Sequence, residues 1–217
     1  MSRPLDVLRE RLPALFEGGV AQLRQRAETG DAAARVRLDD VTGARSALRL
    51  VVEGDGELWI GVEGGQLTAG ATRPEGLPVR LAVAVPSQAV QSAFDALPEG
   101  AAEDDRVAHH LVAMASKRAE GVIEGQRLDF HVCVEDVPDL GTVVARVAVG
   151  AEEPPETPRF TATLRHEDLE QARERRVDPQ QFLMGGRVRF AGDYVPALQL
   201  GMQLAQAMQP PRGGGVP

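Results

Sequence analysis

Residues 160–204 read FTATLRHEDLEQARERRVDPQQFLMGGRVRFAGDYVPALQLGMQL, and the order of patterns in this stretch decides the fold. The alternation at 160–164 predicts a strand, and the polar run at 166–169 predicts the start of a helix. Residues 178–181 place an aspartate before a proline, with a glutamine at the third helical position, which is typical of a helix N-terminus. Gly185-Gly186 then ends this short segment.

A second strand and a long helix are expected to follow. Residues 187–191 alternate as Arg-Val-Arg-Phe-Ala, which predicts a short strand with Val188 and Phe190 pointing inward. After a turn at Gly192-Asp193, a last helix is predicted from about Val195 to Met208. Its apolar residues cover more than one narrow stripe, so we expect burial over a broad face: Leu198, Leu200, Met202, Leu204, Ala205 and Met208.

Upstream of residue 160 the patterns predict a helix and a hairpin. Apolar residues share one face of a predicted helix from Val107 to Ala115. Residues 128–134 alternate as a strand, residues 142–149 are predicted to form a second strand, and the turn signals at 136–140 join them. The loop at 152–156 then leads into the strand at 160.

The first hundred residues predict a leading helix and several strands. Residues 4–28 carry leucines at helical spacing, and Gly18-Gly19 is expected to break or kink that helix. Strands are predicted at 35–38, 47–52, 58–62 and 79–85, with a turn at Gly54–Gly56 and an end at Gly64-Gly65. Ser87 is a suitable N-cap for a helix through Phe94.

The two halves follow the same order of elements. Each has a hairpin, an acidic or glycine- and proline-rich loop, a third strand, a polar cap and a helix. A degenerate tandem duplication and an ordinary α+β meander both account for this order. We expect an N-terminal part at 1–100, a second domain at 101–209 and a disordered tail at 210–217.

The second half resembles a known family, the sterol carrier protein type 2 (nonspecific lipid-transfer) domain, most clearly over residues 120–208. The resemblance covers a strand, a polar helix start, a Pro-x-x-Phe-x-x-Gly segment, a basic strand, Gly-Asp and a Met/Leu-rich helix. It is carried by Thr161 to Leu164, Glu167-Asp168-Leu169, Pro179, Phe182, Gly185, Arg187 to Phe190, Gly192-Asp193 and Leu198 to Leu204. The first half lacks this Phe-x-x-Gly and Gly-Asp ending, so it has either lost that part or lends its strands to one enlarged sheet.

The resemblance implies an α+β fold, a twisted and mainly antiparallel sheet covered by helices. It also implies non-catalytic binding or transfer of a fatty acyl, sterol-like or quinone-like molecule in an apolar cavity between sheet and helices. The terminal helix would help to wall and gate that cavity, and methionines suit an adaptable apolar wall. The candidate wall residues are Phe160, Leu164, Phe182, Met184, Val188, Phe190, Leu198, Met202 and Ala205.

Composition excludes several other classes of function. The net charge of -8 makes nucleic acid a poor partner. One cysteine among 217 residues excludes an internal disulfide framework and a cysteine-rich zinc site. The sequence shows neither a signal peptide nor an apolar run that could span a bilayer, so a cytoplasmic location is expected.

No residue pattern points to an enzyme, a metal site or a cofactor. His131 and Cys133 share a strand face, where packing explains them better than a thiol–imidazole pair. His109-His110 diverge on a helix and do not suit one metal, and the glycine clusters lack a nucleotide-binding fingerprint. The alternative to lipid binding is an accessory protein with a closed cavity, acting through a protein partner or a homodimer. That hypothesis is motivated by the leading helix, which must bury Leu8, Leu12, Leu15 and Phe16.

Overall fold

The computed structural model describes residues 3–95, 101–173 and 185–208. In these residues one sheet of eight strands has the order β3-β2-β1-β4-β6-β5-β7-β8. The strands are β1 (Arg45–Glu53), β2 (Gly56–Glu63), β3 (Gln66–Gly70), β4 (Val79–Pro86), β5 (Leu128–Val137), β6 (Gly141–Val149), β7 (Phe160–Arg165) and β8 (Arg189–Gly192).

Seven helices accompany the sheet in the described residues: α1 (Pro4–Glu28), α2 (Ala32–Thr42), α3 (Ser87–Asp95), α4 (Ala101–Met114), α5 (Lys117–Ile123), α6 (His166–Arg173) and α8 (Val195–Met208). None of them is both long and apolar enough to cross a bilayer. Strand β1 runs parallel to β4 and β5 parallel to β7, and the other neighbours are antiparallel. The predicted α+β fold with a mainly antiparallel sheet is confirmed.

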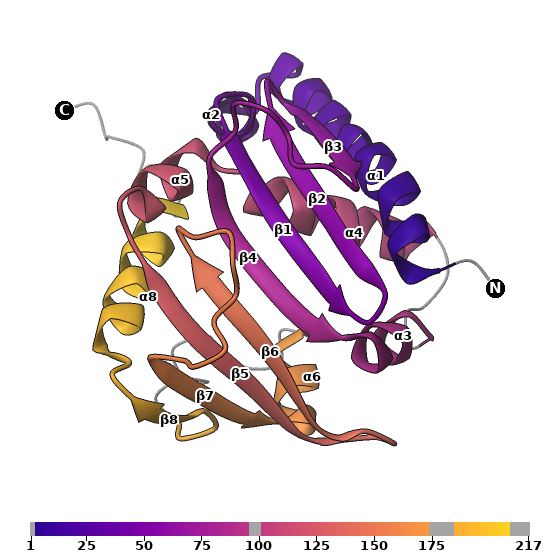
Figure 1. Cartoon of the computed structure of the whole chain (residues 1–217). Coiled ribbons are helices and arrows are strands. Elements are labelled where there is room, and N and C mark those ends of the chain that lie inside the picture. The colour runs from indigo at the N-terminus through magenta and orange to yellow at the C-terminus, as the bar shows by residue number, and fades with distance from the viewer. Residues whose placement is uncertain (1–2, 96–100, 174–184, 209–217) are drawn as a thin grey trace.

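Both halves of the chain contribute to this one sheet, because β4 of the first half pairs with β6 of the second. The enlarged sheet, one of the two expected outcomes, is therefore the one observed (Figure 1). A continuous register row crosses from β2 to β7 and is apolar throughout: Leu58, Leu50, Val83, Val147, Phe130 and Phe160. This row faces the helices, and we call its side of the sheet the helix side. The duplication and the domain boundaries stay predictions.

Helix α1 fills the helix side of the first half. Its buried residues Leu12, Phe16 and Val20 belong to one core with Val52 and Leu58 of the sheet. Val112 of α4 and Ala115, which directly follows α4, join the same core. Figure 1 shows α4 behind β1 and β2. Leu8 also packs against this core, and Leu15 is half-buried. The apolar face of α1 therefore has an internal partner, which removes the motive for docking through this helix.

The expected break in the first helix is wrong, because α1 continues through Gly18-Gly19. Gly19 instead permits a close approach of α4. A Cβ at this position would lie 2.8 Å from Cγ2 of Val112 and 3.1 Å from the carbonyl oxygen of Ala108. Gly18 faces open space, so only one of the two glycines is required by packing.

Three other local predictions differ from the structure. Residues 35–38 lie in α2 rather than in a strand, because Asp31 caps that helix by accepting a hydrogen bond from Ala34 N. A third strand, β3, follows Gly64-Gly65, where we expected only an end. The short helix α5 was not predicted, although Ser116 caps it by accepting from Ala119 N.

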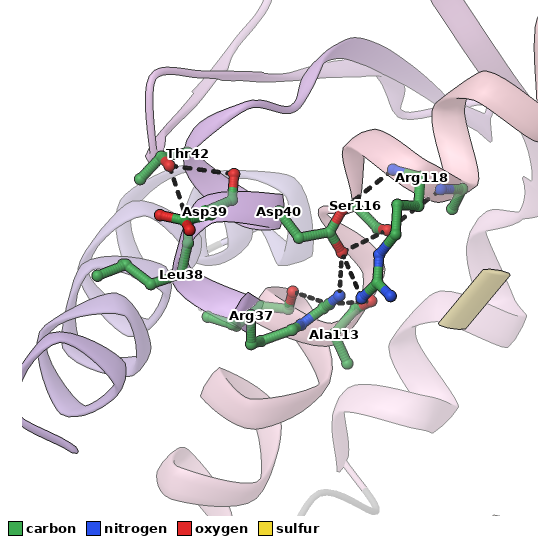
Figure 2. Close-up of polar contacts among 10 residues, drawn as sticks. Arg37, Leu38, Asp39, Asp40, Thr42, Ala113, Ser116 and Arg118 are labelled. Carbon is green, nitrogen blue, oxygen red and sulfur yellow. Dashed lines mark hydrogen bonds and ion pairs between the residues drawn. The ribbon is translucent and has the colours of Figure 1, made fainter. Parts of the chain in front are cut away.

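A buried carboxylate joins α2 to the junction of α4 and α5 (Figure 2). Asp40 accepts hydrogen bonds from Arg37 Nη1 at 2.7 Å, from Ser116 Oγ at 2.8 Å and from Arg118 N at 3.0 Å. Arg37 Nη2 donates to the carbonyl oxygens of Val112 and Ala113, both at 2.6 Å, where α4 ends. These bonds fix the C-terminal end of α4 and the start of α5 to α2.

Candidate ligand-binding face of the sheet

The two sides of the central strand β4 differ in burial. On the side away from the helices, Ala82 is 0% and Ala84 is 1% exposed. On the helix side, Leu81, Val83 and Val85 are only half-buried. The centre of a sheet is normally its best-covered part. Incomplete cover on the helix side of the middle strands therefore makes this surface the candidate ligand-binding site.

The incompletely covered surface continues across β6, β5 and β7. Register places Ala145 beside Val132, Val132 beside Ala162 and Val134 beside Val143, all on the helix side. All of these side chains are half-buried. We call this surface the central apolar face: Val83, Val132, Val134, Val143, Ala145 and Ala162. It contains no charged or polar side chain, so it offers only apolar contacts to whatever lies on it.

Helices α5 and α8 border this face on one side. Leu200 of α8 is buried in a cluster with Leu128 and Val149 of the sheet. Ala197 and Leu204 of α8, together with Val122 and Ile123 of α5, pack against the same cluster. The inward residues of α8 thus recur at positions 197, 200 and 204, which is helical spacing.

A row of aromatic rings forms another border. The rings of Phe130 and Phe160 stack with centroids 4.9 Å apart. The ring centroids of Phe160 and Phe190 are 6.5 Å apart. Phe190 in turn stacks on Tyr194, with ring centroids 4.9 Å apart. The row therefore extends from β5 across β7 and β8 to the start of α8.

The predicted wall residues that the structure describes fall into three groups. Phe160 and Leu164 are buried on the helix side, and Phe190 lies with them because Ala162 pairs with Phe190. Val188 and Leu198 are half-buried. Met202 is 60% exposed and Ala205 is also exposed, on the face of α8 opposite Leu200. Phe182 and Met184 lie outside the described residues.

Sequence reasoning missed Ala197 and the central apolar face itself. Burial was expected for Leu200 and Leu204, which are inward, but also for Met202, Ala205 and Met208, which are exposed. Alternation in residues 128–134 did mark the apolar side of β5. Only the parallel pairing of β5 with β7 adds Ala162 to that surface.

His131 and Cys133, the candidate thiol–imidazole residues, lie on the other side of the sheet. His131 pairs in register with Arg146 and Thr161, and its Nε2 lies 3.1 Å from the carbonyl oxygen of Pro155. Burial raises the pKa of the Cys133 thiol, and the negative charge of Glu135 raises it further, against a hydrogen bond with Thr163 that lowers it. A thiol with a raised pKa is a poor nucleophile at neutral pH.

Three surface hollows lined by described residues lie away from the central apolar face, and one of about 500 Å³ lies beside β2 and β3 and includes Gly61 and Leu77. A second of about 270 Å³ lies among α1, α2 and α4 and includes Arg37, His109 and Met208. Another of about 280 Å³ lies at the end of β7 and is mainly polar, with Asp168 and Arg187 on its wall. In the described part of the chain, no three His, Cys, Asp or Glu side chains gather as a metal site would require.

Comparisons with known proteins give partial structural likeness. No protein-family model matches the sequence, and no curated protein does. A sterol carrier protein domain from Helicoverpa armigera is 23% identical, covers 41% of this chain and 75% of its own, and has a TM-score of 0.32. Sterol carrier protein 2 from Yarrowia lipolytica is 15% identical, with 45% and 80% covered and a TM-score of 0.29.

A mutant sec-alkyl sulfatase is also similar, at 17% identity over 56% of this chain and 20% of its own, with a TM-score of 0.28. Sterol carrier protein domains, the family that residues 160–204 resemble, are thus among the similar solved structures. At these TM-scores the matches do not bear on function, and the chain's own residues must carry the argument.

Proposed function

We propose that the protein binds a hydrophobic small molecule, without catalysis, against the central apolar face. The observation that carries this proposal is the contrast between the two halves of the sheet. On the helix side of the first half, α1 covers the strand residues Val52 and Leu58, which are 1% and 0% exposed. The corresponding side chains of the second half, such as Val132 and Ala145, remain half-buried.

The chemistry of the face favours a ligand with a long apolar part. Burial of each CH₂ group contributes about 0.8 kcal/mol, so a chain of several methylenes gains affinity without any polar anchor. Half-buried valines and alanines present apolar surface to such a chain, and the rings of Phe130 and Phe160 supply a flat apolar border. Fatty acyl, sterol-like and quinone-like molecules all meet this description, in agreement with the sequence resemblance.

A non-catalytic role is part of the proposal. The central apolar face carries no titratable group, and His131 and Cys133 lie on the opposite side of the sheet. General acid–base or nucleophilic catalysis needs such a group within hydrogen-bond reach of the substrate. A ligand on this face would meet none among the described residues that form it.

The test is ligand retention and uptake with a matched pair of variants in β6. Native mass spectrometry and solvent extraction of the purified protein identify any retained molecule, and a pyrene-labelled fatty acid measures uptake. Ala145→Phe places a ring on the central apolar face. Val144→Phe is the control, because Val144 is the next residue of the strand, is also half-buried and points to the other side.

We expect Ala145→Phe to weaken probe uptake about tenfold or more by occupying the space, and Val144→Phe to change it less than about twofold. Circular dichroism and urea unfolding show that both variants remain folded. If native mass spectrometry shows the parent protein without a bound molecule, and the protein takes up no probe, ligand binding is refuted. Equal effects of the two variants refute the assignment to this face.

A further inference from the structure

Helix α8 has a second apolar face that points away from the sheet. Two of the six exposed large hydrophobic residues among the described ones lie on this face, Val195 and Met202. Their exposed fractions are 54% and 60%. Leu198, which is half-buried, and Ala205, which is exposed, lie on the same side of the helix. We call Val195, Leu198, Met202 and Ala205 the outer face of α8.

The exposure is not explained by a poorly packed helix, because the inner face of α8 is occupied. Leu200 is 7% exposed and packs with Leu128 and Val149. The outer face lies on the opposite side of the same helix. Among the residues that the structure describes, no element packs on it in the way that α1 packs on β2 and β3.

Helix α8 also carries no charge. None of its 14 residues is Asp, Glu, Lys, Arg or His, whereas the whole chain has a net charge of -8. The described charged residues nearest in sequence are Asp193, which pairs with Arg159 at 3.2 Å just before the helix begins, and Arg189 of β8. Tyr194, which stacks on Phe190, lies at this same end. An uncharged apolar face with a tyrosine at its edge suits the boundary between water and lipid headgroups, and without Lys or Arg the helix gains nothing from anionic lipids.

We propose that the outer face of α8 docks on the surface of an uncharged or zwitterionic lipid bilayer, with the helix lying in the plane of the interface. Val195, Leu198 and Met202 would enter the boundary between headgroups and acyl chains. The strongly negative chain as a whole would disfavour an anionic surface. This inference concerns the outer face alone and does not require the central apolar face to hold a ligand.

A second copy of the chain fits the outer face less well. A 14-residue helix is about 21 Å long, and a stripe about 10 Å wide along it presents about 200 Å². A stable protein interface needs about 800 Å² from each partner. In addition, no charged side chain flanks the stripe to fix the register of a partner helix, as such residues do in coiled coils. A bilayer needs neither a larger area nor a register.

Flotation with lipid vesicles tests the proposal on the full chain. The vesicles are phosphatidylcholine alone, or phosphatidylcholine mixed with phosphatidylglycerol. Met202→Glu places a charge in the outer face. Met114→Glu is the matched control, because Met114 is 64% exposed, lies at the end of α4 and undergoes the same change of residue and charge.

We expect the parent protein to float with phosphatidylcholine vesicles, little affected by salt, and less with the anionic mixture. Met202→Glu should reduce partitioning about tenfold, and Met114→Glu less than about twofold. Uptake of a pyrene-labelled fatty acid in the absence of vesicles should be the same in both variants, which separates this inference from the proposed ligand binding.

Several results would overturn the inference. The parent protein could fail to float with phosphatidylcholine, or bind the anionic mixture more tightly. The two variants could also lose binding equally. Light scattering that shows a dimer in the parent, broken by Met202→Glu and without vesicle binding, would assign the outer face to a second copy instead.

Discussion

Replacing Asp40 by alanine should be among the most damaging single changes outside the apolar core. Its carboxylate is 3% exposed and accepts hydrogen bonds from Arg37, from Ser116 and from both the backbone and the side chain of Arg118. The alanine variant leaves the fully buried hydroxyl of Ser116 with one partner fewer and removes the acceptor of the Arg118 amide. It also removes the anion that faces the Arg37 guanidinium.

The expected cost follows from these groups. Each buried donor that loses its acceptor costs about 1–3 kcal/mol, and breaking a buried ion pair by removing one partner costs about 3–5 kcal/mol. The side chain of Arg118 is 35% exposed, so we assign nothing to that ion pair. We therefore expect Asp40→Ala to lower the free energy of unfolding by about 3–5 kcal/mol, and Tm by about 10 °C in a chain of this size.

Urea unfolding followed by circular dichroism measures the loss, with Glu63→Ala as the control. Glu63 pairs with Arg45 at 2.8 Å, but both side chains are more than half exposed, so its removal should cost about 0–1 kcal/mol. If Asp40→Ala costs no more than Glu63→Ala, the carboxylate does not hold α2 to α4 and α5 as argued.

The carboxylate of Asp40 also makes the free energy of unfolding decrease as the pH falls into the acid range. Burial alone would raise the pKa of Asp40, but hydrogen bonds from Arg118 and Ser116 and the charge of Arg118 outweigh it, so the pKa is lowered. A lowered pKa contributes stability that is present above the unfolded value, about 3.9, and is lost as pH falls through the folded pKa. The difference in unfolding free energy between the parent and Asp40→Asn should therefore shrink below about pH 4. A difference that stays constant into acid would contradict the assignment.

Two further predictions concern single residues. Gly19→Ala should destabilise by about 1–3 kcal/mol, because its Cβ would meet Val112 and a backbone carbonyl, whereas Gly18→Ala should stabilise by about 0.5–1 kcal/mol. Urea midpoints that move in the same direction for both would refute the close approach of α4. Cys133 should react with a thiol reagent more slowly than free cysteine at neutral pH, because burial and the charge of Glu135 raise its pKa. A rate equal to that of free cysteine would contradict this.

Strands with sustained alternation could be predicted from the sequence, and one short alternation was misleading. Residues 128–134 alternate over seven positions and lie in β5. The four residues 35–38 also alternate, but they follow the helix cap Asp31, and that cap decides the outcome. A four-residue alternation is too short to outweigh a helix start signal.

The orientation of α8 could not be predicted for a different reason. A helix with charges on one side shows which face is wet, and α8 has only glutamines to mark it. Sequence reasoning therefore expected Met202 and Ala205 to be buried together with Leu200 and Leu204, whereas the structure places Leu200, Leu204 and the unpredicted Ala197 inward. The ambiguity that misled the prediction is the same property that gives this helix two apolar faces.

The unequal filling of the two halves follows from where α4 lies. In chain order, α1 and α2 precede the hairpin of β1 and β2, and α4 and α5 precede that of β5 and β6. Yet α4 packs on α1, through Gly19, and Asp40 and Arg37 hold its end against α2. The first half of the sheet is thus covered by its own leading helix and by the one that precedes the second half. The strands of the second half are left with α5, α6 and α8, and the central apolar face is the part that these shorter helices do not cover. Under the duplication hypothesis, the docking of α4 on the first half would be the step that opened a surface on the second.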